Sequence, residues 1–367
     1  MIGSTPSADL FLLALRRTGY DSLLRQTSKF YTLLIPSDSL LISTGYTKDV
    51  ITYLDPTILA KGIIYRSILY GDYSDSLLDG ATGYTDVYTI PDAATLLTDT
   101  FYIAKQAGPT GGLWMSGVRV SRERSGVPAS NGYIHVVDTF YTKPTINAWT
   151  VLNSKPEFSY FVAACRINDS IVNSYTSYNG YRSNLFNVNL PDTEVFIARN
   201  YNISNQTFFV PTNQAFINAG FNTIDDIRNY AVNNTDYSRP TYIDPLDSLI
   251  YGLWMPGINY SAPPNGVNFF YFDLLKNPNI NQRPPAALSY DKPIETELFN
   301  ATTLYNTGSY GKISNYPGVL NFHVQDTTVS VTCSSNSNLP PAVIVERDML
   351  CLNHILIHGV DHLLWPY

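Results

Sequence analysis

The chain has 367 residues, of which 14% are charged, and its net charge is −7 at neutral pH. This weak acidity argues against a nucleic-acid-binding protein, which usually carries a basic surface. No apolar run approaches the roughly 18 residues of a membrane-spanning helix, and the 28 tyrosines and 17 phenylalanines exclude a disordered chain. Composition therefore predicts a folded protein of about two domains, with a polar, weakly charged surface of the extracytoplasmic kind.

The first elements in the chain are a helix, a strand and a second helix. Leu10 to Leu24 predicts an amphipathic helix. Phe30 to Ile35 is a short apolar run rich in strand-forming residues, and Pro36 ends it because proline has no N–H for the ladder. Ser37 or Asp38 can cap the helix that follows.

A turn and a histidine-bearing strand come near the end of the first half. Asn131 and Gly132 form a tight-turn dipeptide, and Tyr133 to Val137 predicts a strand. We expect a ring nitrogen of His135 to satisfy a buried backbone group, and Asp138 to cap the end of the strand.

The same order of motifs recurs in the second half, beginning with the amphipathic helix predicted at Phe158 to Cys165. The matched segments are Gly19–Leu24 with Ile167–Val172, Thr32–Asp38 with Thr207–Asn213, Ile68–Gly71 with Leu249–Gly252, and His135–Asp138 with His358–Asp361. Because the matches keep their order while their offset grows, we predict two copies of one fold, the second enlarged by insertions.

These observations define a domain organisation. Helices and strands mix without regular βαβ alternation, which indicates an α+β fold. The predicted domains are residues 1–147 and 148–367, joined by a linker at 145–156. The insertions of the second domain are expected near 173–200 and 253–331.

The motifs resemble the fasciclin domain. The similarity lies in a Thr-x-x-x-Pro-Ser/Thr-Asp/Asn box, in Leu54-Asp55-Pro56, and in Asn-Gly-x-Ile-His-Val-Val-Asp followed by Pro144. The structural residues that the resemblance identifies are Thr32, Pro36, Asn131, His135, Asp138, Thr207, Pro211, His358 and Asp361. It implies two fasciclin-like domains, each a β-wedge or sandwich packed with helices.

The resemblance also implies a function and a location. Fasciclin domains are secreted or surface-anchored and are associated with adhesion, and in animal members a Tyr-His pair is tied to integrin binding. Here that place is Tyr65-Arg66, without the histidine. The composition looks more like bacterial members, particularly surface lipoproteins of gut Bacteroidetes. This likeness implies an outer-membrane lipoprotein at the cell surface, with a lipid on an N-terminal Cys removed from this chain together with the signal.

The expected partner is a surface or matrix protein, or a glycan. The first predicted binding surface is the segment between Gly252 and Val331, where prolines restrain the backbone and tyrosines offer amphipathic contact area. The tyrosines concerned are Tyr260, Tyr271, Tyr290, Tyr305, Tyr310 and Tyr316. The competing interpretation is that they form a small core beneath the loop. The second candidate surface surrounds Tyr65 and Arg66.

Catalytic and metal-binding chemistry is not expected. His354, His358 and His362 would share one face of a helix, but in a strand residues four apart are roughly 13 Å apart, too far to bind one ion. HExxH, GxSxG and Walker motifs do not occur. We therefore predict no enzyme, no metal and no cofactor. The alternatives are a structural spacer of a surface assembly, or an enzyme acting on polysaccharide.

The cysteines leave one question open. Cys165, Cys333 and Cys351 are the three in the chain, so at least one is unpaired. A bridge between Cys333 and Cys351 is one interpretation, and buried small hydrophobic residues are the other.

Overall fold

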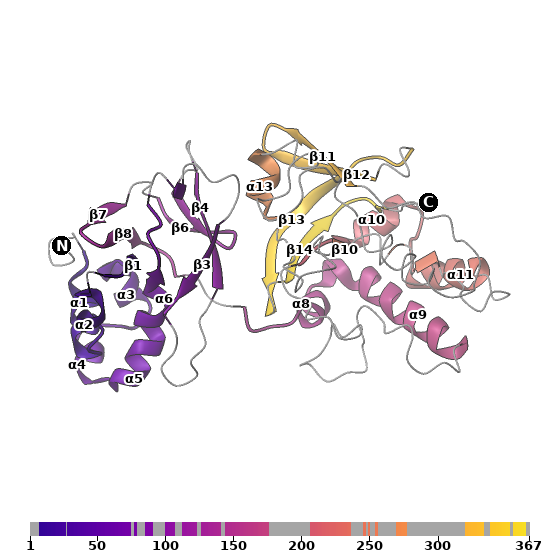
Figure 1. Cartoon of the computed structure of the whole chain (residues 1–367). Coiled ribbons are helices and arrows are strands. Elements are labelled where there is room, and N and C mark those ends of the chain that lie inside the picture. Colours follow the sequence, from indigo (N-terminus) through magenta and orange to yellow (C-terminus); the bar gives the residue numbers. More distant parts are fainter. Residues whose placement is uncertain are drawn as a thin grey trace, which may run out of the picture. The chain divides into compact units, whose positions relative to one another are not determined.

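The chain folds into two compact units, residues 1–142 and 143–367, each with its own sheet and helices (Figure 1). The computed structural model describes residues 7–26, 28–74, 77–78, 85–90, 100–106, 112–122, 126–140, 144–175, 206–235, 245–246, 249, 254–255, 269–276, 320–333, 338–352 and 355–364. The architecture is α+β, as the sequence predicts.

The first unit combines an eight-stranded sheet with a group of short helices, which Figure 1 shows together at one end of the strands. Its elements in chain order are α1 (Asp9–Arg17), α2 (Asp21–Leu24), β1 (Tyr31–Pro36), α3 (Asp38–Ser43), α4 (Lys48–Tyr53), α5 (Pro56–Leu59), η2 (Ala60–Ile64), α6 (Tyr65–Ser67), β2 (Ile68–Tyr70), β3 (Thr85–Thr89), β4 (Thr100–Gln106), β5 (Gly112–Met115), β6 (Val118–Ser121), β7 (Val127–Ala129) and β8 (Gly132–Val137).

The sheet of the first unit has the order β6-β5-β4-β3-β2-β1-β8-β7. Strands β1 and β8 run parallel, and the other pairs are antiparallel. All six residues of β1 are buried. Helix α1 buries Phe11, Ala14 and Leu15 in the same core, an i, i+3, i+4 pattern typical of one helix face. The predicted helix over Leu10 to Leu24 is divided at Gly19, whose φ of 76° lies in the left-handed region.

The second unit contains a longer helix and a six-stranded sheet, in the order β10-β9-β14-β13-β12-β11. Its elements are α8 (Ala148–Ser154), η3 (Pro156–Phe158), α9 (Ser159–Tyr175), β9 (Gln206–Pro211), α10 (Asn213–Asn218), α11 (Ile224–Asn234), β10 (Trp254–Met255), α13 (Tyr271–Lys276), β11 (Leu320–Gln325), β12 (Thr328–Cys333), β13 (Ala342–Cys351) and β14 (Ile355–Val360). Its core includes buried residues of α8, α9, α10, α11 and the strands.

Each unit contains a central pair of parallel strands, and the two pairs have the same register. In the first unit β1 pairs in parallel with β8, so that Pro36 lies opposite Val137. In the second unit β9 pairs in parallel with β14, so that Pro211 lies opposite Val360. Each histidine lies two residues before that position on the partner strand. The strand pairing therefore confirms that Thr32–Asp38 matches Thr207–Asn213 and that the two histidine motifs are equivalent.

Hydrogen bonds around this pair also recur in both units. Of the two candidate caps, Ser37 caps α3 by accepting from the N–H of Leu40, while Asp38 accepts from the N–H of a residue in α1. The matched bonds are Ser37 N to Val137 O (2.9 Å) with Thr212 N to Val360 O (2.9 Å), Leu10 N to Asp38 Oδ1 (2.9 Å) with Tyr160 N to Asn213 Oδ1 (2.9 Å), and Asp138 N to Val120 O (2.9 Å) with Asp361 N to Val343 O (3.1 Å). In both units, therefore, equivalent hydrogen bonds join the central strand pair, the residues just after its first strand and a helix, which is α1 in the first unit and α9 in the second.

Two sequence matches are in the wrong register. The matched bonds of Leu10 and Tyr160 align these two residues, whereas the match of Gly19–Leu24 with Ile167–Val172 would align Leu10 with Phe158.

The other wrong match concerns the second strand. The sequence pairs Ile68–Gly71 with Leu249–Gly252, but β2 and β10 give a different equivalence. Ile68 lies opposite Leu33, whereas Trp254 lies opposite Phe208, the residue that corresponds to Leu33. Strand β2 therefore matches Trp254–Met255. The short Tyr-Gly similarity was too weak to fix the alignment.

The predicted linker and insertion also need correction. Residues 145–156 contain helix α8, because Asn147 caps it by accepting from the N–H of Thr150 at 2.7 Å and its apolar residues join the second core. The predicted insertion 253–331 contains β11 and most of β12. Strand β11 pairs with β12 and β12 with β13, as β4 pairs with β5 and β5 with β6. They belong to the fold common to both units rather than to an added loop.

Candidate functional site

The two motif histidines are buried, as the sequence predicts, with exposed fractions of 3% for His135 and 0% for His358. The Nε2–H of His358 donates to the carbonyl of Phe269 at 2.8 Å, and its Nδ1 accepts from the N–H of Asp348 at 3.4 Å. The ring stacks on Phe209 with centroids 5.4 Å apart. In the first unit, Gly126 lies so close to the ring of His135 that an added Cβ would come within 2.7 Å of it. The ring of His358 therefore links β14 to the backbone of Phe269 and of Asp348.

A polar cluster surrounds His358. Asp348 has a φ of 52°, at an irregularity in the pairing of β13 with β14, and its carboxylate accepts from the N–H of Tyr271 at the start of α13 at 2.8 Å. Burial raises the pKa of Asp348 and lowers the pKa of His358. The nearest carboxylate oxygen is 4.0 Å from Nε2 of the histidine. The His358 side chain is fully enclosed, while 19% of the Asp348 side chain is exposed.

Tyr271 does not provide the exposed contact area expected of it. Its ring is 4% exposed, and its hydroxyl donates to the carbonyl of Thr327 at 2.7 Å and accepts from the N–H of Val329 at 3.1 Å. The guanidinium of Arg347 lies 3.9 Å from the ring centroid. Tyr271 therefore ties α13 to the turn between β11 and β12, in agreement with the competing interpretation of a small core. The other tyrosines of the segment, Tyr260, Tyr290, Tyr305, Tyr310 and Tyr316, lie outside the described residues.

The structure does not bring Tyr65 and Arg66 together in one pocket. The hydroxyl of Tyr65 accepts from that of Tyr20 at 3.2 Å, and their rings meet edge to face at 5.6 Å. Arg66 instead lines a cavity of about 20 Å³ that also touches Leu34 and Val137. A space of that size holds about one water molecule, so it does not form a ligand site.

Metal ligands and disulfides give no site either. Within the described part of the chain, no three His, Cys, Asp or Glu side chains cluster closely enough to bind a metal. His362 Nδ1 lies 3.0 Å from Asp361, while His354 lies outside the described residues. Cys351 is a free buried thiol, and burial raises its pKa to about 12. No bridge joins it to Cys333.

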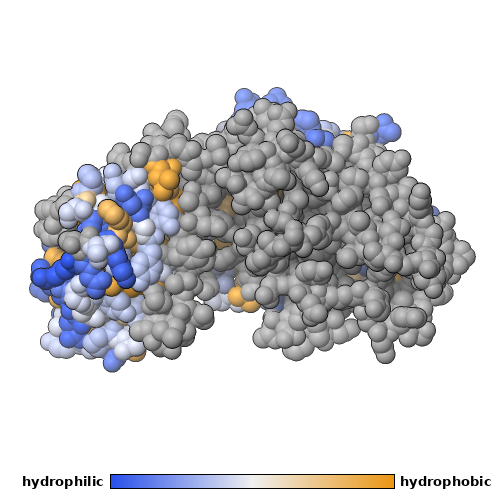
Figure 2. Space-filling model, viewed as in Figure 1, coloured by the Kyte–Doolittle hydropathy of each residue, from blue (hydrophilic) through white to orange (hydrophobic). Residues whose placement is uncertain are grey.

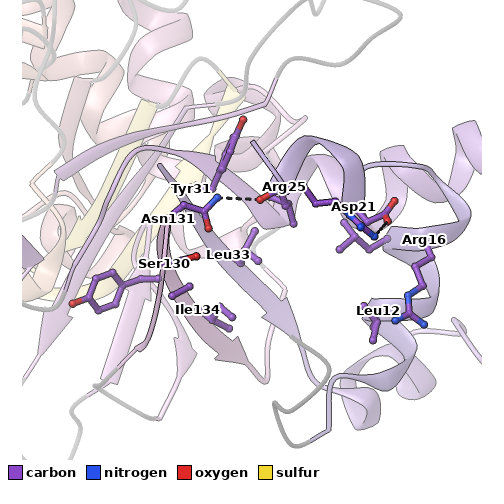
Figure 3. Close-up of a pocket in the computed structure, with 13 residues that line it drawn as sticks. Leu12, Arg16, Asp21, Arg25, Tyr31, Leu33, Ser130, Asn131 and Ile134 are labelled. Atoms are coloured by element: carbon purple, nitrogen blue, oxygen red, sulfur yellow. Dashed lines mark hydrogen bonds and ion pairs between the residues drawn. The ribbon is translucent and has the colours of Figure 1, made fainter. Parts of the chain in front are cut away.

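The larger hollow is in the first unit, between the N-terminal helices and the sheet (Figure 3). We call it the α1–β8 groove, and its volume is about 370 Å³. The helix side is lined by Leu12, Leu15, Arg16, Asp21, Leu24 and Arg25. The sheet side is lined by Tyr31, Leu33, Ala129, Ser130, Asn131, Tyr133 and Ile134. Pockets that hold small molecules usually measure about 300–1,000 Å³, so this groove is large enough for a ligand.

The two sides of the groove are joined at one end. The side-chain amide of Asn131 donates to the carbonyl of Leu24 at 3.0 Å, as drawn in Figure 3. The carbonyl of Asn131 accepts from the N–H of Tyr31 at 3.0 Å. This residue, noted in the sequence as part of a turn, therefore holds α2 against the sheet while lining the cavity.

The charges of the groove come from the helices. Arg25 and Asp21 form an exposed ion pair at 3.1 Å. Arg16 is exposed, and no hydrogen bond or ion pair joins its guanidinium to another of the described residues. Nothing in the sequence marks these three residues as functional, because they lie on the polar face of a helical segment, where charge normally indicates solvent exposure alone.

Comparisons with known proteins give a distant likeness among solved structures and none among family models or curated proteins. No protein-family model matches the chain, and no curated protein matches it. Among solved structures, the chain is similar to a FAS1 domain pair from the insect cell adhesion molecule fasciclin I. The identity is 13%, the alignment covers 98% of this chain and 97% of that one, and the TM-score is 0.33. The shared topology of the two units therefore rests on their strand registers and matched hydrogen bonds. None of the described helices is long and apolar enough to cross a membrane.

Proposed function

We propose that the protein is a non-enzymatic binding module of the adhesion type, built from two fasciclin-like units, that recognises a protein or a glycan. The observation that carries this proposal is the α1–β8 groove, an open hollow of about 370 Å³ with charged and amide side chains on its walls. The imidazole rings of His135 and His358, in contrast, are buried, and that of His358 donates to the backbone carbonyl of Phe269. A binding protein needs a groove of this kind but does not need an accessible reactive side chain.

The location is part of the same proposal. We place the protein at the cell surface, outside the cytoplasm, because its surface is polar but weakly charged and because the motifs resemble a family of secreted and surface-anchored domains. The most specific form of the proposal is a lipid-anchored surface protein of the kind found in gut Bacteroidetes.

A binding assay on the intact chain tests the proposal. The chain is applied to a glycan array and, separately, to a panel of purified cell-surface and matrix proteins, with concentration series for each positive spot. We expect saturable binding to members of one of these two classes. A chain that binds neither class saturably, while it remains folded and monodisperse, would instead be a structural spacer. Turnover of a polysaccharide on the same array would identify an enzyme and refute the proposal.

A further inference from the structure

Resting on the proposed function, we infer that the α1–β8 groove binds an acidic sugar, a ring that carries both a carboxylate and hydroxyl groups. The groove offers three kinds of group in one hollow: a cation, hydrogen-bonding groups and an aliphatic wall. Figure 3 shows the labelled helix residues on one side of the hollow and the labelled strand residues on the other, so a ligand would contact both.

Arg16 provides the anchor for the carboxylate. A guanidinium presents a planar fork that pairs with a carboxylate through two parallel hydrogen bonds. Arg16 forms no ion pair with the other described residues, so its fork does not have to leave a partner when a ligand binds. The adjacent Arg17 points elsewhere, because its guanidinium donates to the carbonyl of Leu54 at 3.1 Å.

The hydroxyl groups of a sugar need acceptors and donors as well. Asp21 lines the groove, and only one of its carboxylate oxygens is bonded to Arg25. The carboxamide of Asn131 uses its N–H₂ on Leu24 and leaves its oxygen to accept. Ser130 adds an exposed hydroxyl. These groups suit several neighbouring hydroxyls.

The ligand class follows from the combination of charges. A simple anion, such as an acidic peptide side chain, would use Arg16 but would bring no hydroxyl groups to the acceptor oxygens of Asp21 and Asn131. A neutral sugar would use Asp21 and Asn131 but would leave Arg16 without a carboxylate. An acidic sugar brings a carboxylate to Arg16 and hydroxyl groups to Asp21 and Asn131. The C–H groups of its ring can lie on Leu12 and other aliphatic side chains of the groove.

The described surface of the first unit argues against a broad apolar partner. On the face shown in Figure 2, the described surface of the first unit is mainly hydrophilic, and its hydrophobic residues form small separate areas. Large apolar interfaces need contiguous patches. A small polar ligand that enters the hollow fits this surface better than an apolar helix that covers it.

The experiment uses a matched pair of ligands and a matched pair of variants. Oligogalacturonate and its methyl ester, which has the same rings and hydroxyls without the charge, are titrated into the intact chain by calorimetry, together with an acidic peptide. The variants are Arg16→Gln and Arg17→Gln. Each removes one positive charge, and the two positions are adjacent in the same helix. Because both arginines are exposed, both variants should keep the melting temperature of the parent.

We expect oligogalacturonate to bind at least about tenfold more tightly than its ester, and Arg16→Gln to weaken that binding about tenfold or more. Arg17→Gln should leave the affinity unchanged. Equal binding of acid and ester, equal effects of the two variants, or Arg16-dependent binding of the acidic peptide would each overturn the inference. If oligogalacturonate does not bind but the chain binds other glycans or proteins saturably, the inference fails and the proposed function stands. If nothing binds, both fail.

Discussion

Replacing His358 tests whether the buried histidine acts through its hydrogen bonds or through the shape of its ring. His358→Met and His358→Gln introduce side chains of nearly equal size and shape, and both remove the stacking on Phe209. Only glutamine can still donate to the carbonyl of Phe269, which now accepts from Nε2 at 2.8 Å. The difference between the two variants therefore isolates this polar contact.

The magnitude follows from the contacts. Loss of the ring stacking costs each variant about 0.5–1.5 kcal/mol. The methionine variant also leaves the Phe269 carbonyl without this buried donor, at a further cost of about 1–3 kcal/mol. We therefore expect His358→Met to lose about 2–4 kcal/mol and His358→Gln about 1 kcal/mol.

Hydrogen exchange measured by mass spectrometry is the suitable assay, because a chain of two units need not unfold in a single transition. Amides of β13 and β14 should exchange faster in the methionine variant than in the glutamine variant, while those of β1 and β8 stay protected. Equal protection of β14 in the two variants would refute the hydrogen-bond argument. Loss of protection in the first unit would refute the assignment of the effect to the second.

The same histidine makes the second unit sensitive to acid. Burial holds the pKa of His358 below its usual value of 6.5. The folded unit therefore binds fewer protons than the unfolded chain just below pH 6.5, and its stability is complete above that pH and falls as the pH drops through the lowered pKa. Asp348, whose pKa is raised by burial, opposes part of this loss as it gains a proton. His358→Gln should remove the histidine-dependent fall in β14 protection between pH 7 and 5; an unchanged pH profile would contradict it.

Three smaller predictions concern single contacts. Gly126→Ala should destabilise the first unit by about 1–3 kcal/mol, because its Cβ would meet the ring of His135, and a thermal melt measures the loss. Thr223→Ala removes a capping box with Asp226 and should cost about 1 kcal/mol of α11 stability, seen as faster amide exchange confined to that helix. Cys351, buried and with a pKa near 12, should resist a thiol reagent until the protein unfolds; rapid labelling under native conditions would contradict its burial.

The central strands could be predicted from the sequence because their signals are local. An apolar run that ends at Pro36 or Pro211, followed by a capping residue, determines a strand and the helix after it. The buried histidines were identifiable for the same reason, since each lies within an apolar strand. The capping residue Asn147 also indicates helix α8. The position of this segment between the two copies favoured a linker instead, and that prediction was wrong.

The groove could not be predicted, because it depends on residues that meet only in the folded chain. Asn131 and Leu24 are 107 residues apart, and their hydrogen bond determines how close α2 lies to the sheet. In the sequence, Arg16 and Asp21 have the pattern of ordinary exposed helix residues. They line a groove only because α2 packs close to the sheet. The burial of Tyr271 was equally non-local, since its hydroxyl partners lie more than 50 residues further along the chain.

The parallel pairing of β1 with β8, and of β9 with β14, has a mechanical consequence. In each unit an early strand lies beside the last one, and both run in the same direction. A force that pulls the start of β1 away from the end of β8 acts along the strands, so the hydrogen bonds between them share the load and break together rather than one after another. Each unit is thereby built to resist extension between its ends, and pulling a single molecule should reveal two high-force rupture events.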